Sequence, residues 1–205
     1  SMHALAPREL AERYAAPVPR YTSYPTAPHF GSDVGPREAA AWISSLPAGA
    51  ALSLYVHIPF CRALCWYCGC STTVINGQRP IVSYLAALDA EMAHTASLLP
   101  ASATVSHLHW GGGSPNTLSP REIRELASRT HELFRLDDTA EFAVEIDPRF
   151  MDEDRATALR DAGVNRVSIG VQDFDPAVQA AINRHQPYEL TRDVVVRHFF
   201  EVIQH

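Results

Sequence analysis

Strand-like and helix-like segments alternate along residues 49–205. Four short segments rich in apolar and β-branched residues predict strands, at 51–58, 104–110, 140–147 and 165–172. The intervening and following segments have helical periodicity and predict helices, at 81–99, 120–134, 152–162, 175–183 and 189–203. Such alternation is typical of α/β proteins, in which helices connect parallel strands. The sequence therefore predicts an α/β fold with about four strand–helix units.

Three of the four predicted strands carry one apolar and one polar face. In the first strand the apolar face holds Leu52, Leu54, Val56 and Ile58. Ser53, Tyr55 and His57 occupy its other face. A parallel sheet covered by helices on both sides is apolar on both faces, and a closed eight-stranded barrel has a bulky apolar interior. We therefore expect a partial (βα) barrel with helices outside and a polar, ligand-binding interior.

The first 48 residues have a different character. We expect a helix at 1–13, an extended arm rich in Pro, Tyr and Thr at 14–36, and a short helix at 36–46. The predicted domain organisation is therefore an N-terminal helix and arm at 1–48 and a core at 49–205.

Composition excludes several classes of protein. The 205 residues are 46% hydrophobic with a formal net charge of -6, which suits one substantial core. There is no block of basic residues, so nucleic acid is not an expected partner. No apolar run approaches the roughly 18 residues of a membrane span, and the N-terminus lacks a secretory pattern. We expect a cytoplasmic protein.

All four cysteines lie in one loop, PFCRALCWYCGC, directly after the first predicted strand. Cys61, Cys65 and Cys68 are spaced so that three thiolates can bind three irons of a 4Fe-4S cluster and leave the fourth iron open. Cysteines this close together do not form a disulfide framework. Structural zinc is the alternative, but Cys68 and Cys70 are too close together to fit its usual paired spacing easily.

Further polar and glycine residues follow the other predicted strands. Three glycines at 111–113 allow a close backbone approach and expose amide groups, although a tight turn would explain them equally. Ser114 adds a hydroxyl there. Glu145 and Gln172 end the third and fourth strands on their polar faces. The weaker candidates are Asp147, Arg184, His57 and the aromatic pair Trp66 and Tyr67.

The segment YVHIPFCRALCWYCGC resembles the signature of the radical S-adenosylmethionine (SAM) enzymes. Within that superfamily the chain resembles the oxygen-independent coproporphyrinogen III oxidases. Four further segments carry this resemblance: PRYTSYPTA at 19–27, LHWGGGSPNTLS at 108–119, EIDPR at 145–149 and SIGVQDF at 168–174.

The resemblance implies a role for each matching position. It makes Cys61, Cys65 and Cys68 the ligands of the 4Fe-4S cluster, and Cys70 a cysteine that does not bind it. Positions around a first SAM molecule are matched by Tyr55, Tyr67, Gly112 and Glu145. Positions around a second SAM molecule are matched by Gly113, Ser114, Gln172 and Arg184.

The implied activity is the anaerobic oxidative decarboxylation of two propionates of coproporphyrinogen III to vinyl groups. The implied partners are this substrate and an electron donor such as a flavodoxin or ferredoxin, and the full-length relatives are expected to be monomeric. The family fold has more strands and a helical C-terminal domain, so this chain resembles only part of it. The alternatives are a haem chaperone of the same superfamily and a non-catalytic iron–sulfur or zinc protein.

Overall fold

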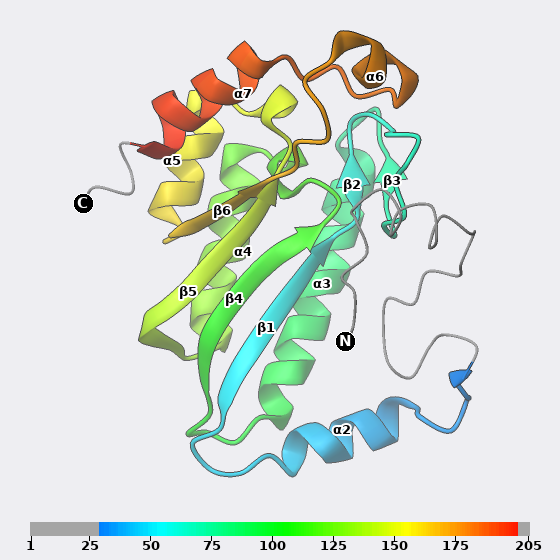
Figure 1. Ribbon diagram of the computed structural model, residues 1–205. Coiled ribbons are helices and arrows are strands. Elements are labelled where there is room, and N and C mark those ends of the chain that lie inside the picture. Colours follow the sequence, from blue (N-terminus) through cyan, green and yellow to red (C-terminus); the bar gives the residue numbers. More distant parts are fainter. Residues whose placement is uncertain (1–28, 201–205) are drawn as a thin grey trace, which may run out of the picture. The chain divides into compact units, whose positions relative to one another are not determined.

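The computed structural model describes residues 29–200 (Figure 1). The helix predicted at 1–13 and most of the predicted arm lie outside these residues. The first described helix is α2 (Pro36–Ser44), which matches the short helix expected at 36–46. Contacts within the chain divide it into two compact units, one ending at Ala39 and the other beginning at Ala40.

Four parallel strands form the central sheet: β1 (Ala51–Ile58), β4 (Thr104–Gly112), β5 (Leu136–Ile146) and β6 (Arg166–Ile169). Their spatial order is β1-β4-β5-β6, so each new strand is added beside the preceding one (Figure 1). The predicted α/β class and the parallel arrangement are confirmed, and the sheet is consistent with part of a (βα) barrel. β5 begins four residues before its predicted start, and β6 ends three residues before its predicted end.

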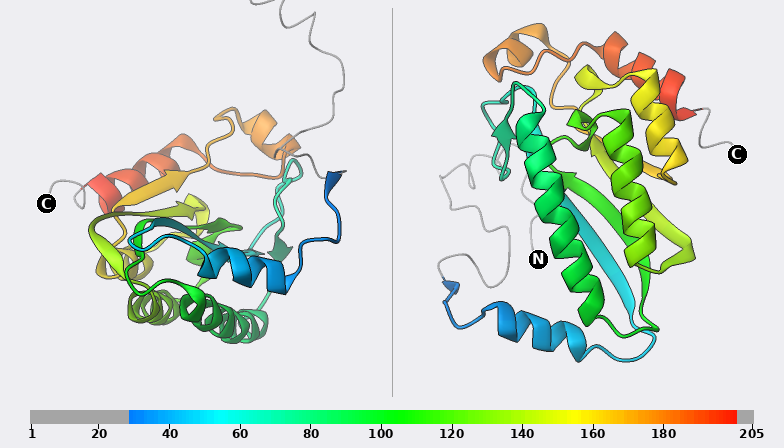
Figure 2. Two further views of the ribbon diagram at one scale, coloured as in Figure 1. Left: turned by 90° about the horizontal axis from the view of Figure 1, so that it is seen from below. Right: turned by 180° about the vertical axis from the view of Figure 1, so that it is seen from behind.

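Helices α3 (Arg79–Leu98), α4 (Pro120–Leu133) and α5 (Glu153–Asp161) cover one face of the sheet (Figure 2). On the opposite face the side chain of Tyr55 is exposed. The chain continues into α6 (Pro176–Ala181), α7 (Tyr188–Val195) and a π-helical turn at Val196–Phe200. Among residues 29–200, no helix has both the length and the apolar character needed to cross a membrane.

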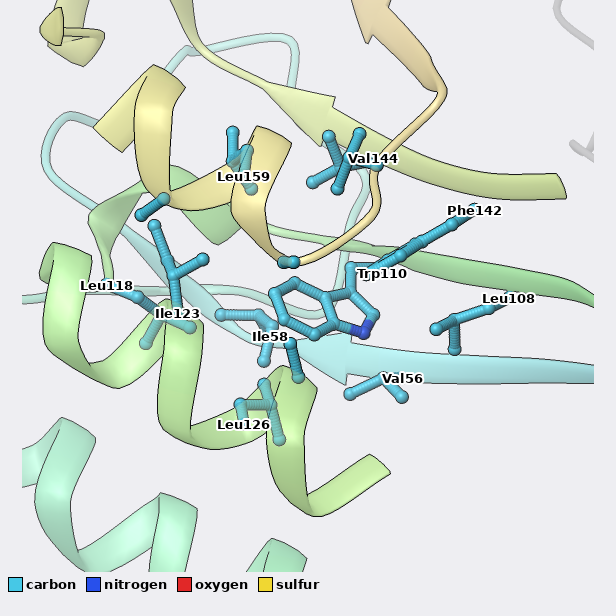
Figure 3. Close-up of a cluster of buried hydrophobic side chains, with 14 of the residues drawn as sticks. Val56, Ile58, Leu108, Trp110, Leu118, Ile123, Leu126, Phe142, Val144 and Leu159 are labelled. Atoms are coloured by element: carbon cyan, nitrogen blue, oxygen red, sulfur yellow. The ribbon is translucent and has the colours of Figure 1, made fainter. Parts of the chain in front are cut away.

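The core lies between the sheet and these helices (Figure 3). Trp110 of β4 is completely buried and packs edge-on against Phe142 of β5, with ring centroids 5.0 Å apart. Ile123 of α4 and Leu159 of α5 close the core from the helical side. Burying one such side chain stabilises the folded state by about 1.5–3 kcal/mol, so this apolar layer holds the strands and their carboxyl ends in place.

Short elements that the sequence pattern did not predict lie at the carboxyl edge of the sheet. They are β2 (Phe60–Cys61), β3 (Thr73–Val74), and the 3-10 turns η2 (Pro115–Thr117) and η3 (Pro148–Phe150). Because all four strands of the sheet are parallel, the loops that follow them meet at this one edge (Figure 1). That edge is where parallel α/β folds place ligands.

Candidate functional site

A cavity of about 370 Å³ lies at the carboxyl edge of the sheet. It is lined by residues of the cysteine loop and of the segments that follow β4, β5 and β6. Among them are Cys61, Cys65, Tyr67, Cys68, Cys70, Gly112, Gly113, Ser114, Glu145, Asp147, Arg149, Gln172 and Arg184. The structure therefore brings together segments that are more than 100 residues apart in the sequence.

Backbone hydrogen bonds hold the base of the cysteine loop against the glycine segment. The Gly113 amide donates to the Ile58 carbonyl at 2.9 Å, and the Ser114 amide donates to the Phe60 carbonyl at 2.8 Å. A Cβ atom on Gly113 would lie 2.8 Å from the Ile58 carbonyl oxygen and only 2.5 Å from that of Phe60. Gly113 is therefore required for this close approach, and it brings Ser114 beside Cys61.

The tip of the cysteine loop is held by the segment after α6. The Trp66 amide donates to the Ile182 carbonyl at 3.1 Å, and the Asn183 side-chain amide donates to the Leu64 carbonyl at 2.7 Å. Asn183 has a φ of 54°, a left-handed conformation that asparagine tolerates better than most residues. The Trp66 side chain is 70% exposed and is absent from the cavity lining, so only Tyr67 of the aromatic pair contributes to the cavity.

The four cysteines are free thiols, and each lines the cavity. The Cys61 sulfur lies 3.7 Å from the Ser114 hydroxyl, and the Cys68 sulfur lies 4.0 Å from the Thr72 hydroxyl. Burial raises the pKa of the Cys61 thiol, and the neighbouring Cys68 adds to the effect. Burial and Cys68 also raise the pKa of Cys70. The Cys61 and Cys70 thiols therefore favour their neutral forms more than a free thiol does.

Two guanidinium groups reach the buried Cys65. Nη1 of Arg184 lies 3.4 Å from the Cys65 sulfur, and Nη2 of Arg149 lies 3.7 Å from it. The Asp147 carboxylate accepts hydrogen bonds from Arg149, the shortest being 2.6 Å, and it lies 3.8 Å from Arg184. The backbone of Asp147 is fixed in turn by the Asn116 side chain, through hydrogen bonds of 2.8 and 3.0 Å.

Arg184 is largely shielded from solvent. Its side chain is 11% exposed, and it donates to the Gly170 carbonyl and to the Gln186 side chain, each at 2.9 Å. Gln186 is itself buried and is hydrogen-bonded to Gln179 and Thr191. This polar network fixes Arg184 over the cavity.

Glu145 belongs to a second polar group at the same edge. Its Oε1 lies 3.1 Å from Nε2 of His109, and its Oε2 accepts a hydrogen bond from the Gly112 amide at 3.2 Å. The Tyr55 ring stacks on His109, with centroids 5.6 Å apart. Burial and the Glu145 carboxylate raise the pKa of Tyr55. Tyr55 is not part of the cavity lining. It contacts His109, which in turn contacts Glu145 of the lining.

Most of the site residues expected from the sequence lie at or beside the cavity, but three residues that contact them were not among those expectations. Arg149, Asn116 and His109 were not singled out from the sequence. Their roles depend on partners that only the fold brings near. An arginine two residues after a strand-terminal aspartate, as in EIDPR, is a signal that could have identified Arg149.

The cavity fits a 4Fe-4S cluster better than a single metal ion. Three cysteine sulfurs in the cavity lining suit iron–sulfur binding, and two arginines can balance the negative charge of a thiolate-bound cluster. Within residues 29–200, no three His, Cys, Asp or Glu side chains are arranged to hold one metal ion. A cluster does not need that arrangement, because each cysteine binds a different iron.

Comparison with known proteins places the chain in a family. Residues 55–197 match the model of the radical SAM superfamily, and this match covers more than half of the chain. The chain belongs to the radical SAM superfamily. Membership implies a 4Fe-4S cluster and SAM as cofactors.

The individual relatives share the name of one enzyme within this superfamily. The chain is 50% identical over 182 residues to an oxygen-independent coproporphyrinogen III oxidase of Paracoccus denitrificans, covering 89% of this chain and 40% of the relative. It is 44% identical over 180 residues to the Escherichia coli protein of the same name, covering 88% and 39%. The solved structure of the E. coli coproporphyrinogen III oxidase superposes with a TM-score of 0.83 at 40% identity, over 95% of this chain and 43% of that one. The chain thus spans about 40% of the length of these curated relatives.

Proposed function

We propose that this chain is the cluster- and SAM-binding part of an oxygen-independent coproporphyrinogen III oxidase. The observation that carries the proposal is the single cavity in which the Cys-x3-Cys-x2-Cys cysteines meet the ends of three further strand segments. The identity to several oxidases of this name supports the choice within the superfamily.

In this proposal Cys61, Cys65 and Cys68 bind three irons, and SAM completes the fourth. Cys70 stays unligated beside Cys68. Two SAM molecules bind at the same edge of the sheet. The first is held by Tyr55, Tyr67, Gly112 and Glu145. The second is held by Gly113, Ser114, Gln172 and Arg184.

The described side chains have chemistry that suits these roles. Glu145 is fixed by His109 and the Gly112 amide, and its carboxylate keeps lone pairs that can accept from cofactor hydroxyl or amino groups. Gly112 has a φ of 105°, and its lack of a side chain leaves room beside the His57 ring. Tyr67 provides an aromatic wall that can stack on a flat ring or exclude water.

When bound, the cluster and SAM together supply a 5′-deoxyadenosyl radical able to take a hydrogen atom from the β-carbon of a propionate. The protein's part is to position the cofactors and substrate and to keep water away. For each propionate, loss of CO₂ and of one further electron leaves a vinyl group. The substrate is coproporphyrinogen III, the initial electron comes from a flavodoxin or ferredoxin, and the reaction takes place in the cytoplasm. The full-length protein is a monomer.

The test has two steps under anaerobic, reducing conditions. The 205-residue chain, reconstituted with iron and sulfide, should cleave SAM to methionine and 5′-deoxyadenosine. The gene product that contains this sequence should then convert coproporphyrinogen III to protoporphyrinogen IX. SAM cleavage without that conversion, together with tight binding in a haem titration, would contradict the oxidase and favour a haem chaperone.

A further inference from the structure

We propose that Arg149 is a positioning residue that acts on the cluster through Cys65 and raises its reduction potential. The inference rests on the proposed function in one respect, namely that Cys65 is a ligand of a 4Fe-4S cluster. Neither the sequence resemblance nor the comparisons assign Arg149 a role.

The first argument is the surroundings of the Cys65 sulfur. Cys65 is 9% exposed, whereas Cys68 and Cys70 are exposed. Its sulfur lies within N–H···S distance of Arg149 and Arg184, at 3.7 and 3.4 Å. Hydrogen bonds to cluster sulfurs and low solvent exposure are among the factors that set the potential of an iron–sulfur centre. Among the three proposed ligands, Cys65 is the least exposed to water. A neighbouring charge should therefore affect the cluster most strongly through this sulfur.

The second argument is that the Arg149 side chain is held in place. Its Nε lies 2.9 and 3.1 Å from the two oxygens of Asp147, and its Nη2 lies 2.6 Å from Oδ2. The two side chains are 11% and 6% exposed. The guanidinium is therefore a fixed positive charge that is largely shielded from solvent.

The third argument is the balance of charge. Arg149 and Arg184 carry two positive charges against the one negative charge of Asp147, so the group is net positive next to the Cys65 sulfur. Adding one electron to the cluster adds one negative charge. A net positive group that is largely shielded from water stabilises that reduced state more than the oxidised state, because charges interact more strongly where water is scarce. Arg149 thus favours acceptance of an electron.

The experiment is a redox titration of the reconstituted 205-residue chain. Dithionite supplies one electron per cluster through soluble mediators, and electron paramagnetic resonance measures the reduced fraction. The variants are Arg149→Gln, which removes the charge, and Arg149→Lys, which keeps the charge but loses the paired hydrogen bonds. The matched control is Arg62→Gln, because Arg62 lies in the same cysteine loop but is exposed and is absent from the cavity lining.

We expect Arg149→Gln to bind the wild-type amount of iron and to lower the reduced-to-oxidised ratio about tenfold at a fixed applied potential. For a one-electron couple this corresponds to a shift of about 59 mV to lower potential. Arg149→Lys should shift the potential in the same direction by less, and Arg62→Gln should leave it unchanged.

Three outcomes would overturn the proposal. The first is an unchanged potential in Arg149→Gln at full iron content. The second is an equal shift in Arg62→Gln, which would indicate a general effect of net charge. If Arg149→Gln binds no cluster, the equally neutral Arg149→Met variant decides, and an unchanged potential there overturns the proposal. Wild-type protein that takes up no cluster would overturn the cluster assignment itself, so the two failures are distinguishable.

Discussion

At the scale of single residues, the site depends on places where no larger side chain fits. Gly113 lies against the backbone of Ile58 and Phe60, and this contact sets the position from which the cysteine loop leaves β1. Gly77, at the far end of the same loop, has open space around its Cα and no left-handed φ. A glycine is therefore required at position 113, where two backbone segments come close together, but not at position 77.

Gly113→Ala should lower the free energy of unfolding by about 1–3 kcal/mol, because the added methyl group forces two backbone segments apart. Gly77→Ala should change it by less than about 0.5 kcal/mol, as is usual for open surface positions. Chemical denaturation followed by circular dichroism measures both. Equal stability of the two variants would contradict the close approach.

His109 connects two residues of the proposed first SAM site, since it contacts both Tyr55 and Glu145. His109→Phe should weaken SAM binding to the reconstituted chain about tenfold, because hydrogen bonds to charged groups contribute roughly 1.5–3 kcal/mol. His109→Gln retains a donor for Glu145 and should lose less. Equilibrium dialysis measures both affinities, and an unaltered affinity in His109→Phe would show that Glu145 needs no such support.

Local sequence identifies residues by chemistry and spacing, and it identified the cysteines, the glycines and Glu145 in this way. It made Arg184 only a weaker candidate, because the network that includes Gln186 and the contact with Cys65, 119 residues away, exist only in the folded chain. Asn116 was missed for the same reason, since its hydrogen bonds reach the backbone of Asp147. Such roles depend on tertiary neighbours.

At the scale of elements, the strand–helix order was predictable, whereas several boundaries were not. β1 has the predicted bounds because its alternation is unbroken. β6 ends at Ile169 because the next carbonyl, that of Gly170, accepts from Arg184. β5 extends back to Leu136 through polar residues that give no alternating signal. β2 and β3 are two residues long, too short for any periodic pattern.

Helix α4 begins with a capping box shortly after the 3-10 turn η2. The Ser119 side chain accepts from the Glu122 amide, and the Glu122 carboxylate accepts from the Ser119 amide at 2.7 Å. Ser119→Ala should cost about 1 kcal/mol of stability. Ser83→Ala, at an exposed position within α3, should be neutral or slightly stabilising. Thermal unfolding checks the pair, and a neutral Ser119→Ala would argue against the cap.

At the scale of the whole molecule, the sheet of residues 40–200 is open. β1 and β6 are its edge strands, each paired on one side within the described chain. The chain spans about 40% of its curated relatives, which is consistent with the partial barrel predicted from the polar strand faces. Unpaired strand edges are templates for association.

The isolated 205-residue polypeptide should therefore associate as its concentration rises. Light scattering coupled to size-exclusion chromatography should give an average mass above that of one chain at high concentration. A constant monomer mass over a hundredfold range of concentration would contradict this expectation.

The central claim is that three of the four thiols in one cavity hold a cluster that SAM completes. The most direct measurement is the electron paramagnetic resonance spectrum of the reduced, reconstituted chain before and after addition of SAM, with each cysteine changed to alanine in turn. We predict a cluster signal that changes with SAM in the wild type and in Cys70→Ala. The signal should be lost or unresponsive in the Cys61, Cys65 and Cys68 variants. A SAM-responsive cluster that survives Cys65→Ala, or that disappears in Cys70→Ala, would contradict the account.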